Sequence, residues 1–124
     1  YAYASNIVGP ENDRFGWATV SQVTGTAAWM DIAATQYLLG IRPVLGGLLV
    51  NPVLPKGWRE VRLQRNYRHK KVDIHIHKKA ATASTRVKRA SLEGTELSPK
   101  SGKILIHECR LSGSGTSRLE VEME

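Results

Sequence analysis

The pattern of apolar positions divides the chain into one helical segment followed by a series of short strands. Residues 24–43, TGTAAWMDIAATQYLLGIRP, form the longest apolar run. Thr24 or Thr26 suits the N-cap, because a threonine hydroxyl accepts a hydrogen bond from a free N–H of the first turn. Gly40 suits the left-handed position after the last turn, and Pro43 stops the helix from continuing. We therefore predict a helix that begins near Thr24 and ends before Gly40.

Apolar side chains cover nearly the whole circumference of this helix, which only Asp31, Thr35 and Gln36 interrupt. A helix with this pattern has to be packed on several sides. A chain of 124 residues can hardly wrap such a helix and also build the strands that follow. We therefore expect its packing partners to lie outside this chain.

After the helix the apolar period changes from that of a helix to the alternation of strands. Residues 45–55 predict a short strand at a sheet edge or in an ordered connection, since glycines and prolines bracket it. Residues 60–68 and 72–77 alternate clearly and predict a hairpin, joined through residues 68–71, with one wet face. Further strands are expected at residues 86–92, 104–111 and 119–123. One helix followed by short antiparallel strands indicates an α+β fragment, the end of a helical domain followed by a β-sandwich.

Composition limits the classes of function. The hydrophobic content of 41% allows one ordinary domain, and no further run is long enough to cross a membrane. The first 22 residues are predicted to be loop, and the absence of an initial methionine is typical of a partial chain. The net charge of +7 raises the question of a nucleic-acid partner. Because the basic residues alternate along strands between Lys56 and Arg89, we interpret them as solvated strand faces instead.

Few residues are candidates for chemistry. Cys109 follows an apolar strand pattern and is expected to be a buried, inert thiol. His75 and His77 point to the same side of one strand, and His69 or His107 could complete a metal site. Neither a cysteine pair nor a neighbouring carboxylate cluster strengthens that hypothesis, so we expect solvent-facing histidines and no metal.

The helix start is the strongest candidate for a binding site. Thr24 and Gly25 offer hydroxyl and free N–H groups at the positive end of the helix dipole, and glycine lets an anion approach the backbone. An ordinary N-cap with a packed glycine explains the same residues. The pattern alone leaves both interpretations open and favours the cap.

The run VTGTAAWMDIAATQYLLGIRP, followed by GLLVNPVLPKGW and then YRHKKVDIHI, resembles the carboxyl-terminal part of glycoside hydrolase family 94. These are inverting disaccharide phosphorylases, which include cellobiose, cellobionic acid and chitobiose phosphorylases. The resemblance implies that residues 1–43 are the end of an (α/α)6 catalytic barrel and residues 44–124 a C-terminal β-sandwich. It also implies that the missing partners of the helix are other barrel helices.

The resemblance assigns roles to particular positions. It implies phosphate binding by Thr24 and Gly25, and the general acid, an aspartic acid, would lie outside these residues. No catalytic residue is therefore assigned, and the chain alone is expected to be inactive. Ser5 and Gln22 are weaker candidates for sugar contacts. Relatives have a sugar-binding glutamine near the position of Ser5. Its replacement by serine puts a plain cellobiose specificity in doubt and leaves cellobionic acid as an alternative substrate.

The family implies a cytoplasmic enzyme that uses inorganic phosphate as co-substrate and no cofactor. Its partners would be a disaccharide, phosphate and the rest of the barrel, with a homodimer left open and neither nucleic acid nor membrane expected. The alternative hypothesis is a non-catalytic β-sandwich module that binds carbohydrate or another protein.

Overall fold

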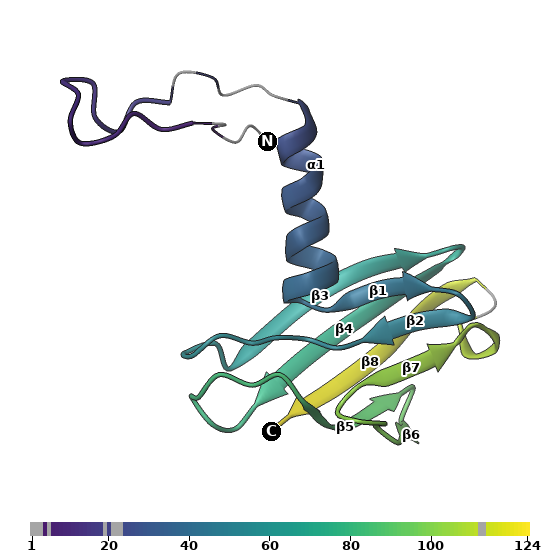
Figure 1. The fold of residues 1–124 in the computed structure, drawn as a ribbon. Coiled ribbons are helices and arrows are strands. Elements are labelled where there is room, and N and C mark those ends of the chain that lie inside the picture. Colours follow the sequence, from purple (N-terminus) through teal and green to yellow (C-terminus); the bar gives the residue numbers. More distant parts are fainter. Residues whose placement is uncertain (1–3, 5, 19, 21–23, 112–113) are drawn as a thin grey trace. The chain divides into compact units, whose positions relative to one another are not determined.

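The computed structural model describes residues 4, 6–18, 20, 24–111 and 114–124 (Figure 1). These fall into two compact units, Tyr1–Ala34 and Thr35–Glu124. The domain boundary expected after residue 43 stays a prediction.

The first unit consists of a loop and a helix. Ile7 and Ala18 form an isolated antiparallel bridge, and the Val8 N–H donates to the Trp17 carbonyl at 2.9 Å. The guanidinium of Arg14 lies 5.7 Å from the centre of the Trp17 ring. The predicted loop is confirmed for the described residues, and its apolar side chains, Ile7, Phe15 and Trp17, are exposed.

The helical stretch begins as predicted and changes its winding halfway. Helix α1 (Thr24–Ile32) continues as a π-helix, η1 (Ala33–Leu38), which the sequence pattern did not predict. Thr26 lies inside α1, so it is not the N-cap. Gly40 has a φ of 65°, as the left-handed position after a helix requires. A Cβ there would lie 2.0 Å from the carbonyl oxygen of Asn51, so this position also demands glycine for space.

The large aromatic side chains of this stretch are exposed in the part of the chain that the structure describes. Trp29 is 70% exposed and Tyr37 is 61% exposed. None of the side chains described between residues 25 and 38 is buried. Such exposure is unusual for large aromatic residues, and it agrees with the expectation that their partners lie outside this chain.

A three-stranded antiparallel sheet follows, in the order β1 (Ile41–Val44), β2 (Gly47–Val50) and β7 (Ile104–His107). β1 was not predicted, because Pro43 seemed only to terminate the helix. Proline is tolerated there since β1 is an edge strand. The expectation of an edge position for residues 45–55 is wrong for β2, which is the central strand.

The second sheet has five strands in the order β3 (Glu60–Tyr67), β4 (Lys70–Lys78), β8 (Gly115–Met123), β5 (Val87–Leu92) and β6 (Thr95–Leu97). The predicted hairpin of β3 and β4 is confirmed, with Arg68 at a φ of 53° in its turn. β5 and β6 form another hairpin. β4 and β8 pair in parallel, whereas only antiparallel pairs were expected.

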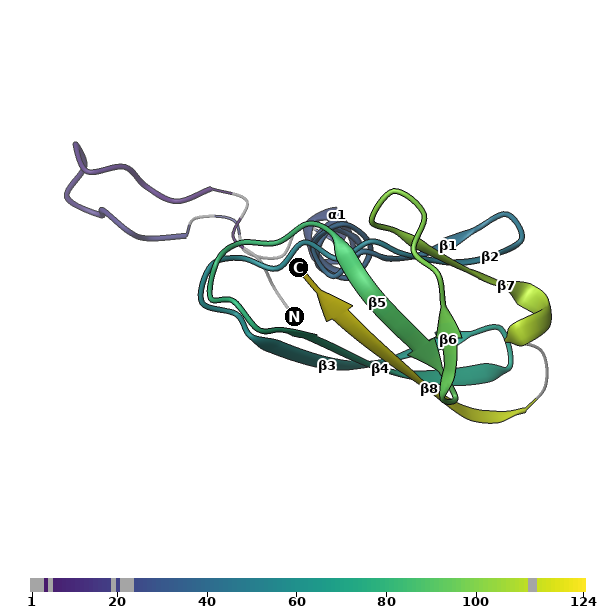
Figure 2. The same cartoon turned by 90° about the horizontal axis from the view of Figure 1, so that it is seen from below.

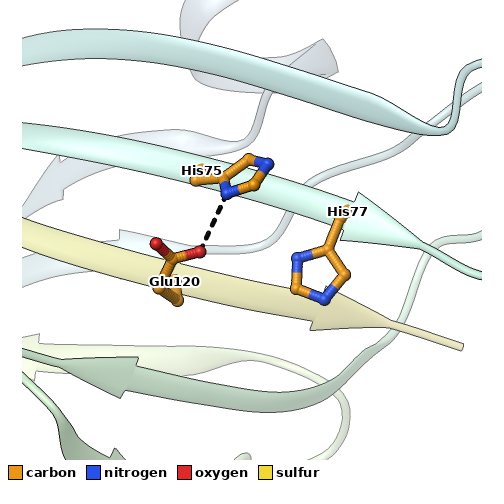
Figure 3. Close-up of side chains that lie close together, drawn as sticks. All are labelled: His75, His77 and Glu120. Atoms are coloured by element: carbon orange, nitrogen blue, oxygen red, sulfur yellow. Dashed lines mark ion pairs between the residues drawn. The ribbon is translucent and has the colours of Figure 1, made fainter.

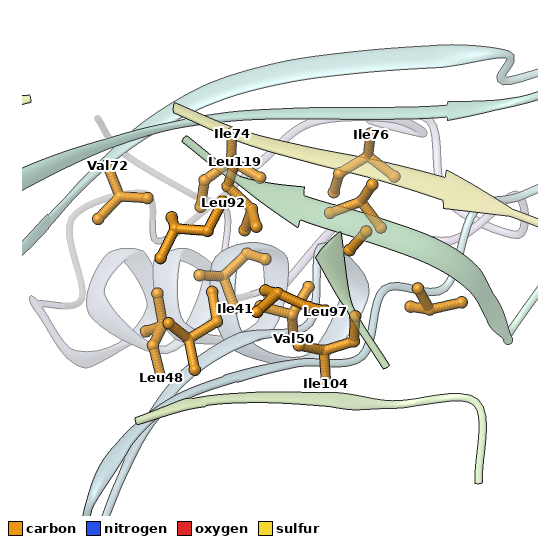
Figure 4. Close-up of a cluster of buried hydrophobic side chains, with 14 of the residues drawn as sticks. Ile41, Leu48, Val50, Val72, Ile74, Ile76, Leu92, Leu97, Ile104 and Leu119 are labelled. Carbon is orange, nitrogen blue, oxygen red and sulfur yellow. The ribbon is translucent and has the colours of Figure 1, made fainter. Parts of the chain in front are cut away.

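The two sheets form the layers of a sandwich, as Figure 2 shows, which confirms the predicted fold class. Alternate residues of β4, namely Val72, Ile74 and Ile76, point into the layer between the sheets. They meet Leu48, Val50 and Ile104 from the other sheet in one hydrophobic core (Figure 4). The outer positions of β4 are therefore left for polar side chains.

Two expectations outside the strands also have outcomes. The strand predicted for residues 104–111 ends at His107 and continues as a 3-10 helix, η2 (Glu108–Arg110). Cys109 is therefore exposed, and the expectation of a buried thiol is wrong. No helix among the described residues has both the length and the apolar character that a membrane span requires.

Candidate functional site

The predicted phosphate site lies at the start of α1. The helix begins at Thr24, and its first turn contains no acidic side chain that would repel an anion. Among the described residues, a Cβ at Gly25 would meet the Trp29 ring at 4.0 Å and no other atom within that distance. The side chain of Thr24, and the weaker candidates Ser5 and Gln22, lie outside the described residues. The phosphate role of Thr24 and Gly25 stays a prediction.

A second group of polar side chains gathers on the outer face of the five-stranded sheet. The parallel register places His75 opposite Glu120 and His77 opposite Glu122. One ligand atom from each of His75, His77 and Glu120 lies within 4.8 Å of the other two. Figure 3 shows the two imidazoles of β4 beside the carboxylate of β8. We call these three residues the histidine cluster.

His75 is held between two carboxylates. Its Nδ1 lies 2.9 Å from Oε2 of Glu120, and its Nε2 lies 2.9 Å from Oε1 of Glu60. The second approach is short but poorly aligned, so Nε2 has no hydrogen-bond partner among the described residues. The side chain of His75 is only 24% exposed, which keeps most water away from these contacts.

Glu60 is a stable anion in this arrangement. Nε of Arg62 donates a hydrogen bond of 2.6 Å to its carboxylate. This bond and the charge of Arg62 lower the pKa of Glu60, and His75 adds a smaller effect in the same direction. An ionised carboxylate therefore faces Nε2 of His75.

Next to the cluster lies a hollow of about 480 Å³ on the outer sheet face. Polar groups line it, including Arg62, Gln64, Asp73 and Arg118, and Gln64 donates to Asp73 at 2.6 Å. Its lining contains no tyrosine, tryptophan or phenylalanine, among the described residues, on which a sugar ring could stack. The hollow therefore gives the carbohydrate-binding alternative no support.

The sequence pattern found two members of the histidine cluster and missed the third. It nominated His69 or His107, but His69 lies in the turn between β3 and β4 and His107 ends β7 in the other sheet. The sequence pattern did not nominate Glu120. Nothing in the local pattern says which strand pairs with β4, and only that pairing brings this carboxylate to the histidines.

Sequence comparison finds proteins to which this chain is similar. Residues 41–93, from β1 to the turn after β5, match glycosyl hydrolase family 65, C-terminal domain. The chain is 35% identical over 97 residues to solabiose phosphorylase of Paenibacillus borealis, which is 78% of this chain and 12% of that protein. It is 30% identical over 98 residues to N,N'-diacetylchitobiose phosphorylase of Vibrio proteolyticus. That match covers 76% of this chain and 12% of the relative.

A third relative is 3-O-beta-D-glucopyranosyl-beta-D-glucuronide phosphorylase of Paenibacillus borealis. It is 35% identical over 66 residues, which are 53% of this chain and 9% of that protein. The chain is thus similar to the C-terminal part of disaccharide phosphorylases and spans 12% or less of these three relatives. The similarity agrees with the expected class of enzyme, although the matching domain family carries the number 65 where we named family 94. The disaccharides in these names differ from cellobiose and cellobionic acid.

Proposed function

We propose that this chain is the C-terminal part of an inverting phosphorylase that cleaves a β-linked glucosyl disaccharide with inorganic phosphate, giving α-glucose 1-phosphate. The observation that carries the proposal is the extent of the similarity. The 97 matched residues exceed the 90 residues of the unit Thr35–Glu124, so the match reaches back into the first unit. The similarity therefore includes more than a widespread β-sandwich.

The exposed apolar helix supports a position inside a larger domain. Trp29, Met30 and Tyr37 are exposed, although a surface helix normally presents polar residues to water. In the proposed enzyme these side chains pack against other helices of an (α/α)6 barrel. Covering them removes the apolar surface that the 124 residues leave open.

The start of α1 supplies the proposed phosphate contact. Free N–H groups and the positive end of the helix dipole favour an anion. The open space beside Gly25 lets phosphate approach the backbone, and the Thr24 hydroxyl is assigned a hydrogen bond to it. Phosphate then replaces the water and the general base of an inverting hydrolase, while an aspartic acid outside this chain protonates the leaving oxygen.

The remaining parts of the proposal follow from the same class of enzyme. The reaction takes phosphate as co-substrate and needs no cofactor, and the enzyme works in the cytoplasm. Its disaccharide is of the cellobiose or cellobionic acid type. The three relatives are named for other disaccharides, so the substrate has to be determined directly.

The test is phosphorolysis by the complete protein that contains this chain. Cellobiose, cellobionic acid, solabiose and N,N'-diacetylchitobiose are each incubated with phosphate, and release of the sugar 1-phosphate is measured. We expect turnover of a glucosyl disaccharide that depends on phosphate, with inversion at the anomeric carbon seen by NMR. Hydrolysis without phosphate, or no turnover of any disaccharide by a folded protein, would overturn the proposal.

A further inference from the structure

We infer that the histidine cluster, His75, His77 and Glu120, is a binding site for a zinc ion that joins strands β4 and β8. This inference does not rest on the proposed phosphorylase activity. Two imidazole nitrogens and one carboxylate oxygen are ligands that zinc accepts, with a water completing four-fold coordination. Calcium and magnesium prefer oxygen ligands alone, so two imidazoles favour a transition metal.

The contacts of His75 bring its Nδ1 to 2.9 Å from Oε2 of Glu120. A neutral imidazole has one N–H and one lone pair. Two bare acceptors at this distance would repel each other, so a proton or a metal ion lies between these atoms. This pair alone fits either of them.

His77 decides in favour of the metal. Its Nδ1 is inaccessible to water and has no hydrogen-bond partner among the described residues. In Figure 3 the His77 ring stands beside the carboxylate of Glu120 and follows His75 along the same strand. A proton on His75 would satisfy Glu120 but leave Nδ1 of His77 unpaired. A zinc ion would accept the lone pairs of all three residues at once.

The geometry needs only a small adjustment. Ligand atoms around tetrahedral zinc lie about 3.4 Å apart, given bond lengths of about 2.0–2.2 Å. The three atoms here already lie within 4.8 Å of one another, and side-chain rotations can close that difference.

The test is a zinc titration of the full 124-residue chain, purified without a histidine tag and stripped with a chelator. Binding is measured in competition with a chromophoric chelator, and thermal unfolding is followed with and without zinc. We expect one equivalent to bind and to raise the melting temperature. His77→Ala and Glu120→Gln should each weaken binding at least tenfold and remove most of that rise.

His69→Ala and His107→Ala are the matched controls, because both histidines lie outside the cluster. They should bind zinc like the unaltered chain. His77→Gln replaces His77→Ala if the latter does not fold, which circular dichroism of the zinc-free protein shows. Binding of less than half an equivalent, equal affinity in the cluster variants, or an equal loss in the controls would overturn the inference.

Discussion

Nζ of Lys78 donates a hydrogen bond of 2.7 Å to the carbonyl oxygen of Pro55, which ties the end of β4 to the connection before β3. The same ammonium group also donates to the carbonyls of Leu54 and Thr82. Lys78 is only 4% exposed, and these three partners are backbone carbonyls rather than carboxylates. Its charge is therefore stabilised by the dipoles of two loops.

Lys78→Met tests the strength of this arrangement. We expect a loss of about 1–3 kcal/mol in the free energy of unfolding, because buried carbonyls lose a charged donor. Lys79→Met is the control, since the Lys79 side chain is 86% exposed and its loss should change stability by less than about 0.5 kcal/mol. Urea unfolding measures both. A more stable Lys78→Met would show that desolvation of the ammonium outweighs its hydrogen bonds.

Gly40→Ala should be among the most damaging small substitutions in the chain. The left-handed backbone costs about 1–2 kcal/mol for a residue with a Cβ, and the approach to the Asn51 carbonyl adds about 1–3 kcal/mol of overpacking. Gly46→Ala separates the two terms, because Gly46 has a φ of 87° but no atom within 4 Å of the place that a Cβ would take. Urea unfolding of both variants measures the difference. Equal losses would contradict the steric contribution.

Gly25→Ala should have opposite effects in two settings. In the 124-residue chain alanine meets only Trp29 at 4.0 Å and should stabilise α1 by up to about 1 kcal/mol. In the complete phosphorylase the added methyl should occupy phosphate space and raise the phosphate KM. Thermal unfolding and phosphate kinetics measure the two effects. An unchanged phosphate KM would remove Gly25 from the proposed site.

Thr24→Val should weaken the use of phosphate without loss of side-chain volume. The missing hydroxyl removes a charge-assisted hydrogen bond of about 1.5–3 kcal/mol, roughly a ten- to hundredfold effect. If Thr24 only stabilises the helix start, the variant lowers the melting temperature and leaves the phosphate dependence unchanged. Kinetics and melting of the complete enzyme distinguish these outcomes.

The 124-residue chain should self-associate through its exposed helix and show no phosphorolysis. Trp29→Gln removes a highly exposed aromatic side chain of α1 and should shift sedimentation toward the monomer. Trp58→Gln is the control, because it changes an exposed tryptophan outside the helix. A monomeric unaltered chain, or an equal shift with Trp58→Gln, would contradict this assignment.

The strands could be predicted where one face is wet and the other buried. The alternation of Val72, Ile74 and Ile76 with polar residues predicted β4, and Gly40 predicted the end of the helix, because both depend on neighbours in sequence. β1 was missed because four residues containing a proline carry too little pattern. The exposure of Cys109 was missed because the strand before it ends at His107.

The two candidate sites also differ in whether they depend on neighbours in the sequence. Thr24 and Gly25 could be named because an anion site at a helix start is a local pattern. The histidine cluster could not, since Glu120 reaches His75 only through a parallel pairing between strands 45 positions apart. The alternation of apolar and polar residues predicts which face of the sheet a side chain occupies. It does not predict which strand pairs with its own strand.

The parallel pairing of β4 and β8 also affects how the chain can fold during synthesis. β8 lies between β4 and β5 in the sheet, yet the ribosome makes it after both of them. Until residues 115–123 have emerged, β4 and β5 each present an unpaired edge, and Ile74 and Ile76 lack their neighbours Leu119 and Val121. The two hairpins can close early, but the sheet between them must wait for a contact of high sequence separation, a slow step. A nascent chain that pauses before residue 115 therefore carries two open strand edges, the kind of intermediate that chaperones bind.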